Sequence, residues 1–232
     1  MAAKRTKKTD RVLILKTVGA DMRAHGGFEW PTSGPVECPT WDPTPDCGGG
    51  LHGLLWGCGS GLIDPDDPTR KWVVFAADPA DVVEVGAKVK ARRGDVVFVG
   101  IRDEAIAYLD ANGAADKPVA YATHTSGAEG TSTSGYRGTS TSGAEGTSTS
   151  GAEGTSTSGD WGTSTSGDRG TSTSGDWGTS TSGKRGIIVC RWWDGTAGRW
   201  RLTVGYVGED GIEPDVPYRA DSAGRLVKAE VA

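Results

Sequence analysis

The chain has 232 residues, of which 24% are charged, and a formal net charge of −5 at pH 7. This length allows one or two domains, and the acidic balance gives no support for a nucleic-acid partner. The apolar run at residues 12–15 ends at Lys16, so it is too short for a membrane span or a signal peptide. We therefore expect no nucleic-acid or membrane partner and a cytoplasmic location.

Two segments precede the centre of the chain. Residues 1–8 carry four basic side chains and are expected to form a disordered tail. Residues 9–118 have the mixed pattern of an α+β domain, with a loop-rich stretch at 31–68 that is dense in Pro, Gly, Asp and Cys. Residues 11–18 are a strand candidate, and apolar or alternating runs make 71–77, 82–90 and 95–99 β-rich.

A single helix is predicted in this domain over residues 102–111, where Ile106 and Leu109 share one face. Gly113 lies just beyond its end and suits a helix stop.

No set of residues in this domain has the pattern of a catalytic or metal site. Cys38, Cys47, His52 and Cys58 lack the close-paired spacing of zinc ligands. The glycine-rich segment 47–53 lacks the lysine of a phosphate-binding loop and is expected to be a tight turn. We therefore predict no enzyme activity, no cofactor and no metal. Zinc or a disulfide remains the alternative to free thiols.

Residues 123–186 are eight consecutive octads of the form Thr-Ser-Thr-Ser-Gly-x-x-Gly. Only the two x positions vary, apart from His124, which replaces a serine in the first octad. A strict short period is typical of a solenoid. A flexible Gly/Ser/Thr linker is the alternative, and the strict period with folded segments on both sides disfavours it.

The octad has the composition of one strand and one turn. Thr-Ser-Thr-Ser suits a strand because the branched threonine side chain favours a pleated surface. The flanking glycines suit a turn, where we expect them to adopt positive φ and to permit close backbone approach. Two octads then complete one coil. The sequence predicts a flat β-solenoid with 16 residues per coil and about four coils, rising about 4.8 Å per coil.

The variable residues test this register. One edge of a 16-residue coil places Trp161 beside Trp177, a predicted aromatic stack. The other edge aligns Arg137, Glu153 and Arg169, whose charges alternate. Two like-charged pairs disfavour the register, namely Glu129 with Glu145 and Arg169 with Arg185.

Either the threonines or the serines point outward. Inward serines let the two sheets approach closely and form hydroxyl hydrogen bonds along the axis, whereas inward threonines need more width. We favour outward threonines, with His124 beneath them. The candidate binding residues on the two faces are then Thr123, Thr125, Thr139, Thr141, Thr155, Thr157, Thr171 and Thr173, and Thr131, Thr133, Thr147, Thr149, Thr163, Thr165, Thr179 and Thr181.

The C-terminal segment is predicted to close the solenoid. Residues 187–190, Ile-Ile-Val-Cys, continue the phase of Thr-Ser-Thr-Ser and are expected to form an apolar last rung. Residues 191–232 are expected to be a small antiparallel β cap, with Trp192, Trp193 and Trp200 as its aromatic core. Strands are predicted at 189–193, 199–206 and 225–230, with a hairpin turn at 194–198.

The fold class expected is therefore mainly β. A solenoid over residues 119–190 is capped by the α+β domain at 9–118 and by the β cap at 191–232.

Segments outside the repeats carry a first resemblance, at residues 26–31, 47–53, 191–195 and 205–212. Through them the whole chain resembles a family of uncharacterised actinobacterial and phage-encoded octapeptide-repeat proteins. Octads in that family often read Thr-Ala-Thr-Ala-Gly, which implies small residues inside and threonines outside. The family implies fold and organisation, and no activity.

The repeat carries a second resemblance. Ser-Gly-x-x-Gly-Thr-Ser-Thr matches at Gly127, Thr131 and Thr133, and in every later octad, and so resembles the octads of bacterial ice-nucleation proteins. The Thr-x-Thr grid also resembles the surfaces of antifreeze solenoids. The chain departs in having few repeats and Tyr136 alone in place of a tyrosine ladder. These departures disfavour strong nucleation, which needs a large surface, more than simple ice binding.

Three functions fit this sequence. We predict an ice-binding, antifreeze-like repeat protein whose partner is ice or ordered water, with self-association through sheet ends or faces as a further option. The alternative is a rigid structural or assembly scaffold of phage or mobile-element origin without ice activity. The third is a ligand-binding or enzymatic N-terminal domain on a solenoid stalk. Repeats regularised by design would give the same pattern.

Overall fold

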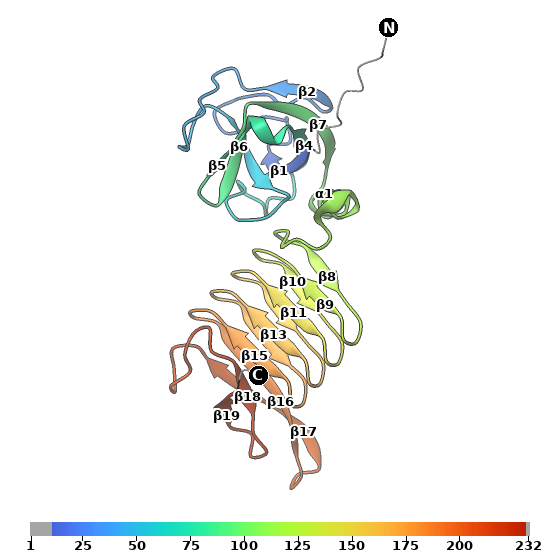
Figure 1. Cartoon of the computed structure of the whole chain (residues 1–232), viewed down its shortest axis with the longest axis vertical. Helices are drawn as coiled ribbons and strands as arrows, with labels where there is room; N and C mark the ends of the chain where they lie inside the picture. Colours follow the sequence, from blue (N-terminus) through green and yellow to red (C-terminus); the bar gives the residue numbers. More distant parts are fainter. Residues whose placement is uncertain (1–10, 231–232) are drawn as a thin grey trace. The chain divides into compact units, whose positions relative to one another are not determined.

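The computed structural model describes residues 11–230, so the predicted basic tail at 1–8 lies outside the described residues. The chain divides between Ala115 and Asp116 into two compact units. The first unit is a sheet with one α-helix, and the second is a solenoid with its C-terminal cap (Figure 1).

The N-terminal unit contains a seven-stranded antiparallel sheet in the order β2-β7-β4-β1-β3-β6-β5. Its strands are β1 (Val12–Val18), β2 (Gly34–Glu37), β3 (Leu51–Leu55), β4 (Lys71–Ala77), β5 (Val82–Val85), β6 (Lys88–Ala91) and β7 (Arg93–Gly100). Its helical segments are the 3-10 turn η1 (Pro79–Asp81), the helix α1 (Arg102–Leu109) and the π turn η2 (Asp110–Ala114).

The sheet curls around one apolar core. Val36 of the edge strand β2 and Val89 of β6, next to the other edge, belong to the same buried cluster as Ile14 and Phe75. Phe75 is fully buried, and burying such a side chain contributes about 1.5–3 kcal/mol to folding. The curled sheet is therefore held mainly by the removal of apolar surface from water.

The predicted strands at 71–77 and 95–99 and the helix are present, and Gly113 has positive φ at the helix end. The structure adds detail to two further segments. Segment 82–90 is two strands because Gly86, with φ 60°, closes a turn between β5 and β6. The loop-rich stretch contains β2 and β3, and β3 tolerates Gly53 because a Cβ there would lie 2.6 Å from the Leu15 carbonyl oxygen of β1.

The solenoid consists of two parallel sheets that face each other across the coil. One contains β8 (Thr123–Thr125), β10 (Thr139–Thr141), β12 (Thr155–Thr157), β14 (Thr171–Ser174), β16 (Ile187–Asp194) and the antiparallel edge strand β17 (Arg199–Tyr206). The other contains β9 (Thr131–Thr133), β11 (Thr147–Ser150), β13 (Thr163–Ser166), β15 (Thr179–Ser182), and antiparallel β18 (Tyr218–Ala220) and β19 (Leu226–Lys228).

The 16-residue coil is confirmed by the strand register. Thr139 pairs with Thr155, and Thr147 pairs with Thr163, so each strand bonds to the strand two octads away. Successive turns are joined as well, because the Gly143 N–H donates to the Gly127 carbonyl oxygen at 3.0 Å.

The turns differ from the prediction in one respect. The second variable residue of every octad has positive φ, between 54° at Arg137 and 60° at Trp161, whereas the octad glycines do not. The glycines are required by close approach instead, since a Cβ at Gly159 would lie 2.6 Å from the Ala144 nitrogen of the preceding coil. The expectation of close approach was right, and that of positive φ at the glycines was wrong.

Short apolar segments cover both ends of the solenoid. At the start, Val119, Ala120 and Ala122 are fully buried, and the Gly135 N–H donates to the Val119 carbonyl oxygen at 2.8 Å. At the end, the apolar rung is present, because Ile187 pairs with Thr171 of β14. That the whole domain at 9–118 caps the first coil stays a prediction.

The C-terminal cap has a small apolar core of Ile188, Cys190, Val207, Ile212 and Tyr218. Strand 199–206 is present as β17, segment 225–230 contains the shorter β19, and β18 was missed.

The predicted aromatic core was wrong for two of its three members. Trp193 and Trp200 are each 46% exposed and meet edge to face, with ring centroids 5.1 Å apart. They lie opposite each other beside the turn of the β16–β17 hairpin, beyond the apolar cluster.

Candidate functional site: the threonine ladders

The sixteen predicted threonines form two ladders on the two parallel sheets. The first ladder consists of Thr123, Thr125, Thr139, Thr141, Thr155, Thr157, Thr171 and Thr173 of β8, β10, β12 and β14. The second ladder consists of Thr131, Thr133, Thr147, Thr149, Thr163, Thr165, Thr179 and Thr181 of β9, β11, β13 and β15.

Every threonine of the two ladders is exposed or half-buried, whereas the serine between the threonines of each rung after the first is buried. Ser140, Ser156 and Ser172, which lie under the first ladder, have no exposed surface. This follows from the alternation of side chains along a strand. The threonines therefore point outward and the serines inward, as favoured from the sequence.

The inward serine hydroxyls make the interior of the solenoid polar, and most of these hydroxyls are hydrogen-bonded. Ser148 Oγ lies 2.6 Å from the Thr157 carbonyl oxygen, to which it donates, and 2.9 Å from Ser142 Oγ. Similar contacts recur at Ser140 and Ser180. These bonds tie one sheet to the other across the coil, so they hold the threonine surface rigid. The described buried hydroxyls without a protein partner are those of Ser126, Ser150 and Ser158.

His124 occupies a serine position of the first rung and points inward, as predicted. It pairs in register with Ser140, and its Nδ1 is hydrogen-bonded to the Thr133 carbonyl oxygen. The larger ring is accommodated where the solenoid begins.

Aromatic and charged side chains stand on the turns at the two edges. Trp161 and Trp177 stack with ring centroids 5.7 Å apart and planes 12° apart, as predicted. On the opposite edge, Glu153 accepts from Arg137 at 3.0 Å and pairs with Arg169 at 3.3 Å, which confirms the predicted charge ladder. The Arg137 hydrogen bond lowers the pKa of Glu153. The ladders themselves carry no charged residue.

Aspartates at the first variable position join successive coils. Asp160 Oδ1 accepts from the Asp176 N–H at 2.8 Å, and Asp168 Oδ1 accepts from the Lys184 N–H at 2.8 Å. Asp160 also forms an ion pair with Arg191 of β16. Burial, followed by the charge of Asp160, raises the pKa of Asp176.

The first ladder continues beyond the repeats into an apolar surface that sequence reasoning missed. Thr171 and Thr173 pair with Ile187 and Val189, which pair in turn with Tyr206 and Val204 of β17. Val204 and Tyr206 are 48% and 52% exposed. The sequence did contain a signal for this surface, because Ile187 occupies the same position in the eight-residue period as the first threonine of each octad.

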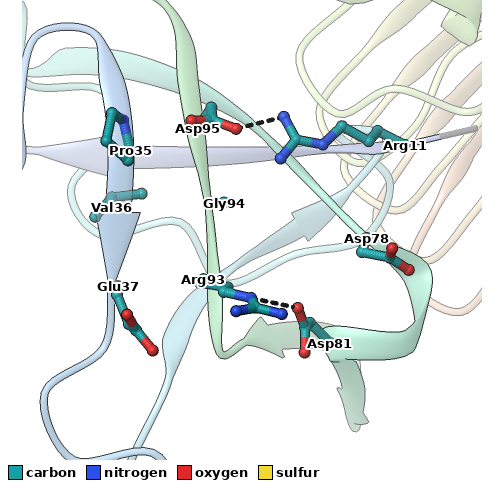
Figure 2. A pocket seen from close by; sticks show the side chains of 9 residues that line it. All are labelled: Arg11, Pro35, Val36, Glu37, Asp78, Asp81, Arg93, Gly94 and Asp95. Carbon is teal, nitrogen blue, oxygen red and sulfur yellow. Dashed lines mark hydrogen bonds and ion pairs between the residues drawn. The ribbon is translucent and has the colours of Figure 1, made fainter. Parts of the chain in front are cut away.

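The N-terminal unit contributes no comparable constellation. Its pocket at β2 and β7, of about 450 Å³, contains charges that are already paired, Arg11 with Asp95 at 2.5 Å and Arg93 with Asp81 at 2.9 Å (Figure 2). Among residues 11–230, no three His, Cys, Asp or Glu side chains gather as metal ligands. All four cysteines lie in that range, and no disulfide joins any of them. Within the described part of the chain, no helix is long and apolar enough to span a bilayer.

Fold and site together define a β-solenoid that presents two outward threonine ladders, and its relatives by sequence carry one name. The chain is 39% identical over 107 residues to an ice nucleation protein of Pseudomonas fluorescens, covering 45% of this chain and 9% of that protein. It is 38% identical over 104 residues to ice nucleation protein InaU of Pantoea ananas, covering 44% and 10%. It is 36% identical over 118 residues to an ice nucleation protein of Pseudomonas syringae pv. syringae, covering 50% and 10%.

The chain thus spans about a tenth of the length of these relatives. No protein-family model matches it, and no solved structure matches it.

Proposed function

We propose that this protein binds ice through the first threonine ladder. One observation supports this above all: threonines of consecutive coils lie in register, with no charged residue among them. Strand geometry sets a grid of about 4.8 Å between coils and about 6.7 Å between threonines on one strand. Each point of the grid offers a methyl group and a hydroxyl group, which together order water at a fixed spacing.

The first ladder is a better candidate than the second because the residues that directly continue the two ladders differ in charge. Ile187 and Val189 extend the first surface without adding charge. The second ladder ends at β18, whose Arg219 is exposed next to the inward-facing Tyr218. An ammonium or guanidinium group holds its own hydration shell tightly and disrupts an ordered water layer. The larger uncharged array therefore belongs to the first sheet.

We further infer that the protein restrains ice growth and does not nucleate ice efficiently. Each ladder has eight threonines over four coils, whereas nucleation needs a large surface. The relatives named ice nucleation proteins are about ten times longer than the region shared with this chain. Freezing of supercooled droplets tests this part, and a freezing temperature well above that of buffer would contradict it.

Thermal hysteresis and ice-crystal shaping test the binding surface itself. Thr155→Lys replaces an exposed central threonine of the first ladder and is expected to abolish hysteresis at little cost in stability. Thr163→Lys makes the same change on the second ladder, and Ala152→Lys makes it on a turn. Both controls should keep wild-type activity. Equal activity of Thr155→Lys and wild type would exclude the first ladder as the ice surface.

A rigid scaffold without ice activity is the second candidate, and the edge strand β17 favours it. Trp200, Leu202, Val204 and Tyr206 of β17 are between 46% and 63% exposed along one face. An exposed apolar edge strand is typical of a surface that pairs with another chain. Absence of both hysteresis and crystal shaping in the wild type would contradict ice binding and leave the scaffold.

A further inference from the structure

A cavity of about 490 Å³ lies in the N-terminal unit, beside a smaller one of about 80 Å³. Lys16, His52, Ile63 and Lys88 line both. The larger cavity is also lined by the glycine-rich segment 47–50 that precedes β3. The proposed ice-binding function assigns no role to this glycine-rich segment.

The charged groups that line the two cavities are all basic. Lys16 of β1 and Lys88 of β6 contribute ammonium groups, and no Asp or Glu lines either cavity. Within residues 11–230, neither lysine is paired with a carboxylate; Lys16 Nζ instead lies 5.6 Å from the Trp30 ring centroid. Burial and the charge of Lys88 lower the pKa of Lys16 to about 8. The cavity therefore holds uncompensated positive charge.

Two residues that line the larger cavity each carry a buried N–H group without an acceptor in the protein. His52 Nε2 accepts from the Gly48 N–H at 3.4 Å, so the proton of the neutral ring is on Nδ1, which is buried and without a partner. Trp30 Nε1 is likewise buried without a partner. Burial, followed by the charge of Lys88, lowers the pKa of His52 and keeps the ring neutral. Buried donors of this kind are normally paired, but both nitrogen atoms are covered by protein, so the case for a ligand rests on the two lysines and on the shape of the cavity.

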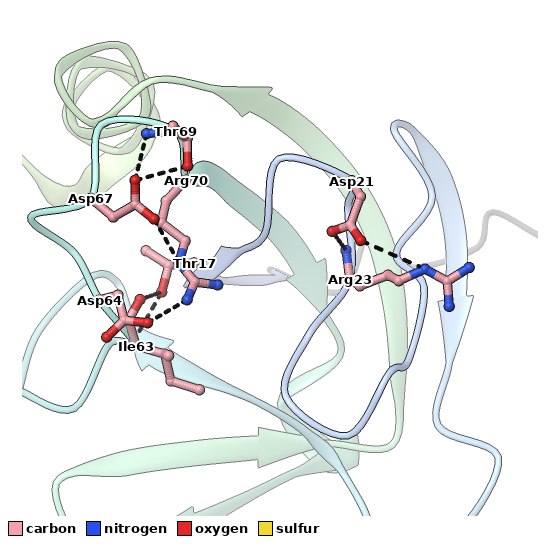
Figure 3. A network of polar contacts seen from close by, with 8 residues as sticks. All are labelled: Thr17, Asp21, Arg23, Ile63, Asp64, Asp67, Thr69 and Arg70. Carbon is pink, nitrogen blue, oxygen red and sulfur yellow. Dashed lines mark hydrogen bonds and ion pairs between the residues drawn. The ribbon is translucent and has the colours of Figure 1, made fainter.

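Residues that do not line the larger cavity hold its walls in place. The fully buried Lys90 donates to the carbonyl oxygens of Asp46 at 2.9 Å and Gly48 at 3.1 Å, which fixes the glycine-rich segment. Figure 3 shows Thr17 beside Ile63, donating to its carbonyl oxygen at 2.8 Å and accepting from its N–H at 3.1 Å. A preformed cavity binds more tightly because less conformational freedom is lost on binding.

Part of the remaining wall is apolar. Phe28, Trp30 and Leu51 line the larger cavity. They would cover the hydrocarbon part of a ligand but would leave a small inorganic anion without contacts on that side.

We propose that this cavity binds a small organic carboxylate, with its oxygens near Lys16, Lys88 and His52 and its apolar part against Phe28 and Leu51. The carboxylate supplies the missing negative charge beside the two lysines. Charge-assisted hydrogen bonds to two ammonium groups make this stronger than a neutral contact. This site is independent of the threonine ladders and of ice binding.

Calorimetric titration of the full chain with benzoate tests the proposal, with benzamide as a neutral probe of the same shape and phosphate as an inorganic anion. Benzoate is expected to bind, and benzamide and phosphate to bind at least about tenfold more weakly. Lys16→Met and Lys88→Met should each weaken benzoate binding about tenfold or more, because each removes one charged hydrogen bond. Lys71→Met removes a lysine of the same unit that lines neither cavity, and its affinity should match wild type.

Circular dichroism of each variant checks that it is folded. If Lys16→Met is unfolded, the test rests on Lys88→Met alone. Equal binding of benzamide and benzoate, tighter binding of phosphate, or no benzoate binding at all would each overturn the proposal. Unchanged affinity in a folded Lys88→Met would do so as well.

Discussion

The two units of this protein are both built from β-sheets, and their interiors are opposite in kind. The N-terminal sheet surrounds side chains such as Phe75, Ile14 and Trp30, which differ in size and shape. The solenoid surrounds rows of serines, of which Ser148 and Ser164 are typical and have no exposed surface. Side chains of mixed size fit a curled sheet. A row of identical small side chains instead permits identical flat coils and hence a regular outer surface.

The difference also changes what stabilises each unit. Removal of apolar area from water contributes most in the N-terminal unit. In the solenoid, backbone ladders, hydroxyl hydrogen bonds and close glycine contacts replace it. We therefore expect the N-terminal unit to respond most to lost volume and the solenoid to respond most to added volume.

Phe75→Ala is expected to have the largest effect. Loss of this fully buried ring leaves a cavity in the curled sheet, and the N-terminal unit should lose about 3–5 kcal/mol of unfolding free energy. Urea unfolding followed by circular dichroism measures this, and the solenoid transition should stay in place. Val97→Ala, on an exposed position of β7, is the control and should be close to neutral. A shift of both transitions by the same amount would show that the units do not unfold separately.

Gly159→Ala is expected to have the next largest effect, within the solenoid. The added methyl group would lie 2.6 Å from the Ala144 nitrogen, and the coils must separate to admit it. Overpacking of this kind costs about 1–3 kcal/mol, at the upper end where the obstacle is backbone. The solenoid melting temperature measures the loss. Gly195→Ala is the control, because the nearest atom beyond its chain neighbours would be 4.0 Å from the added Cβ, and it should leave the melting temperature of the solenoid unchanged. Tolerance of Gly159→Ala would mean that the stacking is loose.

The sequence was sufficient to predict the coil, because the variable residues identify the register. Trp161 on Trp177, and Glu153 between Arg137 and Arg169, occur in the structure as the 16-residue period predicts. The like charges at Glu129 and Glu145 did not prevent it, since both are exposed on the turn and screened by water. The positions of the sixteen threonines followed from the same period.

Other features could not be predicted because they depend on tertiary contacts. The conformation of the turn decides which residue takes positive φ, and composition alone favours glycine over Trp161 or Arg137. Strand β3 is short and contains Gly53, which only its neighbour β1 makes suitable. The cavity at Lys16 and Lys88 joins β1 to β6, strands that are distant in sequence and separated by β3 in the sheet.

Ser148→Ala and Ser158→Ala sharpen the comparison at a smaller scale. Ser148 Oγ donates to the Thr157 carbonyl oxygen at 2.6 Å, and that oxygen also accepts from the Ser142 N–H at 2.9 Å. Loss of the hydroxyl therefore removes one of two hydrogen bonds and should cost about 0.5–1.5 kcal/mol. Ser158 Oγ is buried without a protein partner, so its removal should be neutral or stabilising. Thermal unfolding of the two variants measures the difference. Equal losses would mean that serine volume, and not the hydrogen bond, stabilises the interior.

The smallest expected effect is the pH dependence of the charge ladder at Glu153. The Arg137 hydrogen bond lowers the pKa of Glu153 below its ordinary value of 4.5, so the folded state binds its proton more weakly than the unfolded state. Its contribution to stability is therefore present above pH 4.5 and is lost as pH falls through the lowered pKa. Asp176, whose pKa is raised by burial and by Asp160, opposes this trend, so variants must be compared with one another.

The solenoid of Glu153→Gln should consequently lose less stability on acidification than that of the wild type. Glu145→Gln removes the same group from the opposite edge, where no ion pair with a described residue involves it, and should match the wild-type profile. Melting temperatures measured between about pH 6 and pH 3 separate the variants. Because the pair is solvent-exposed, high salt should reduce the difference between Glu153→Gln and wild type. Parallel profiles for all three proteins at low salt would show that the ladder at Arg137 and Arg169 aligns the turns without stabilising them.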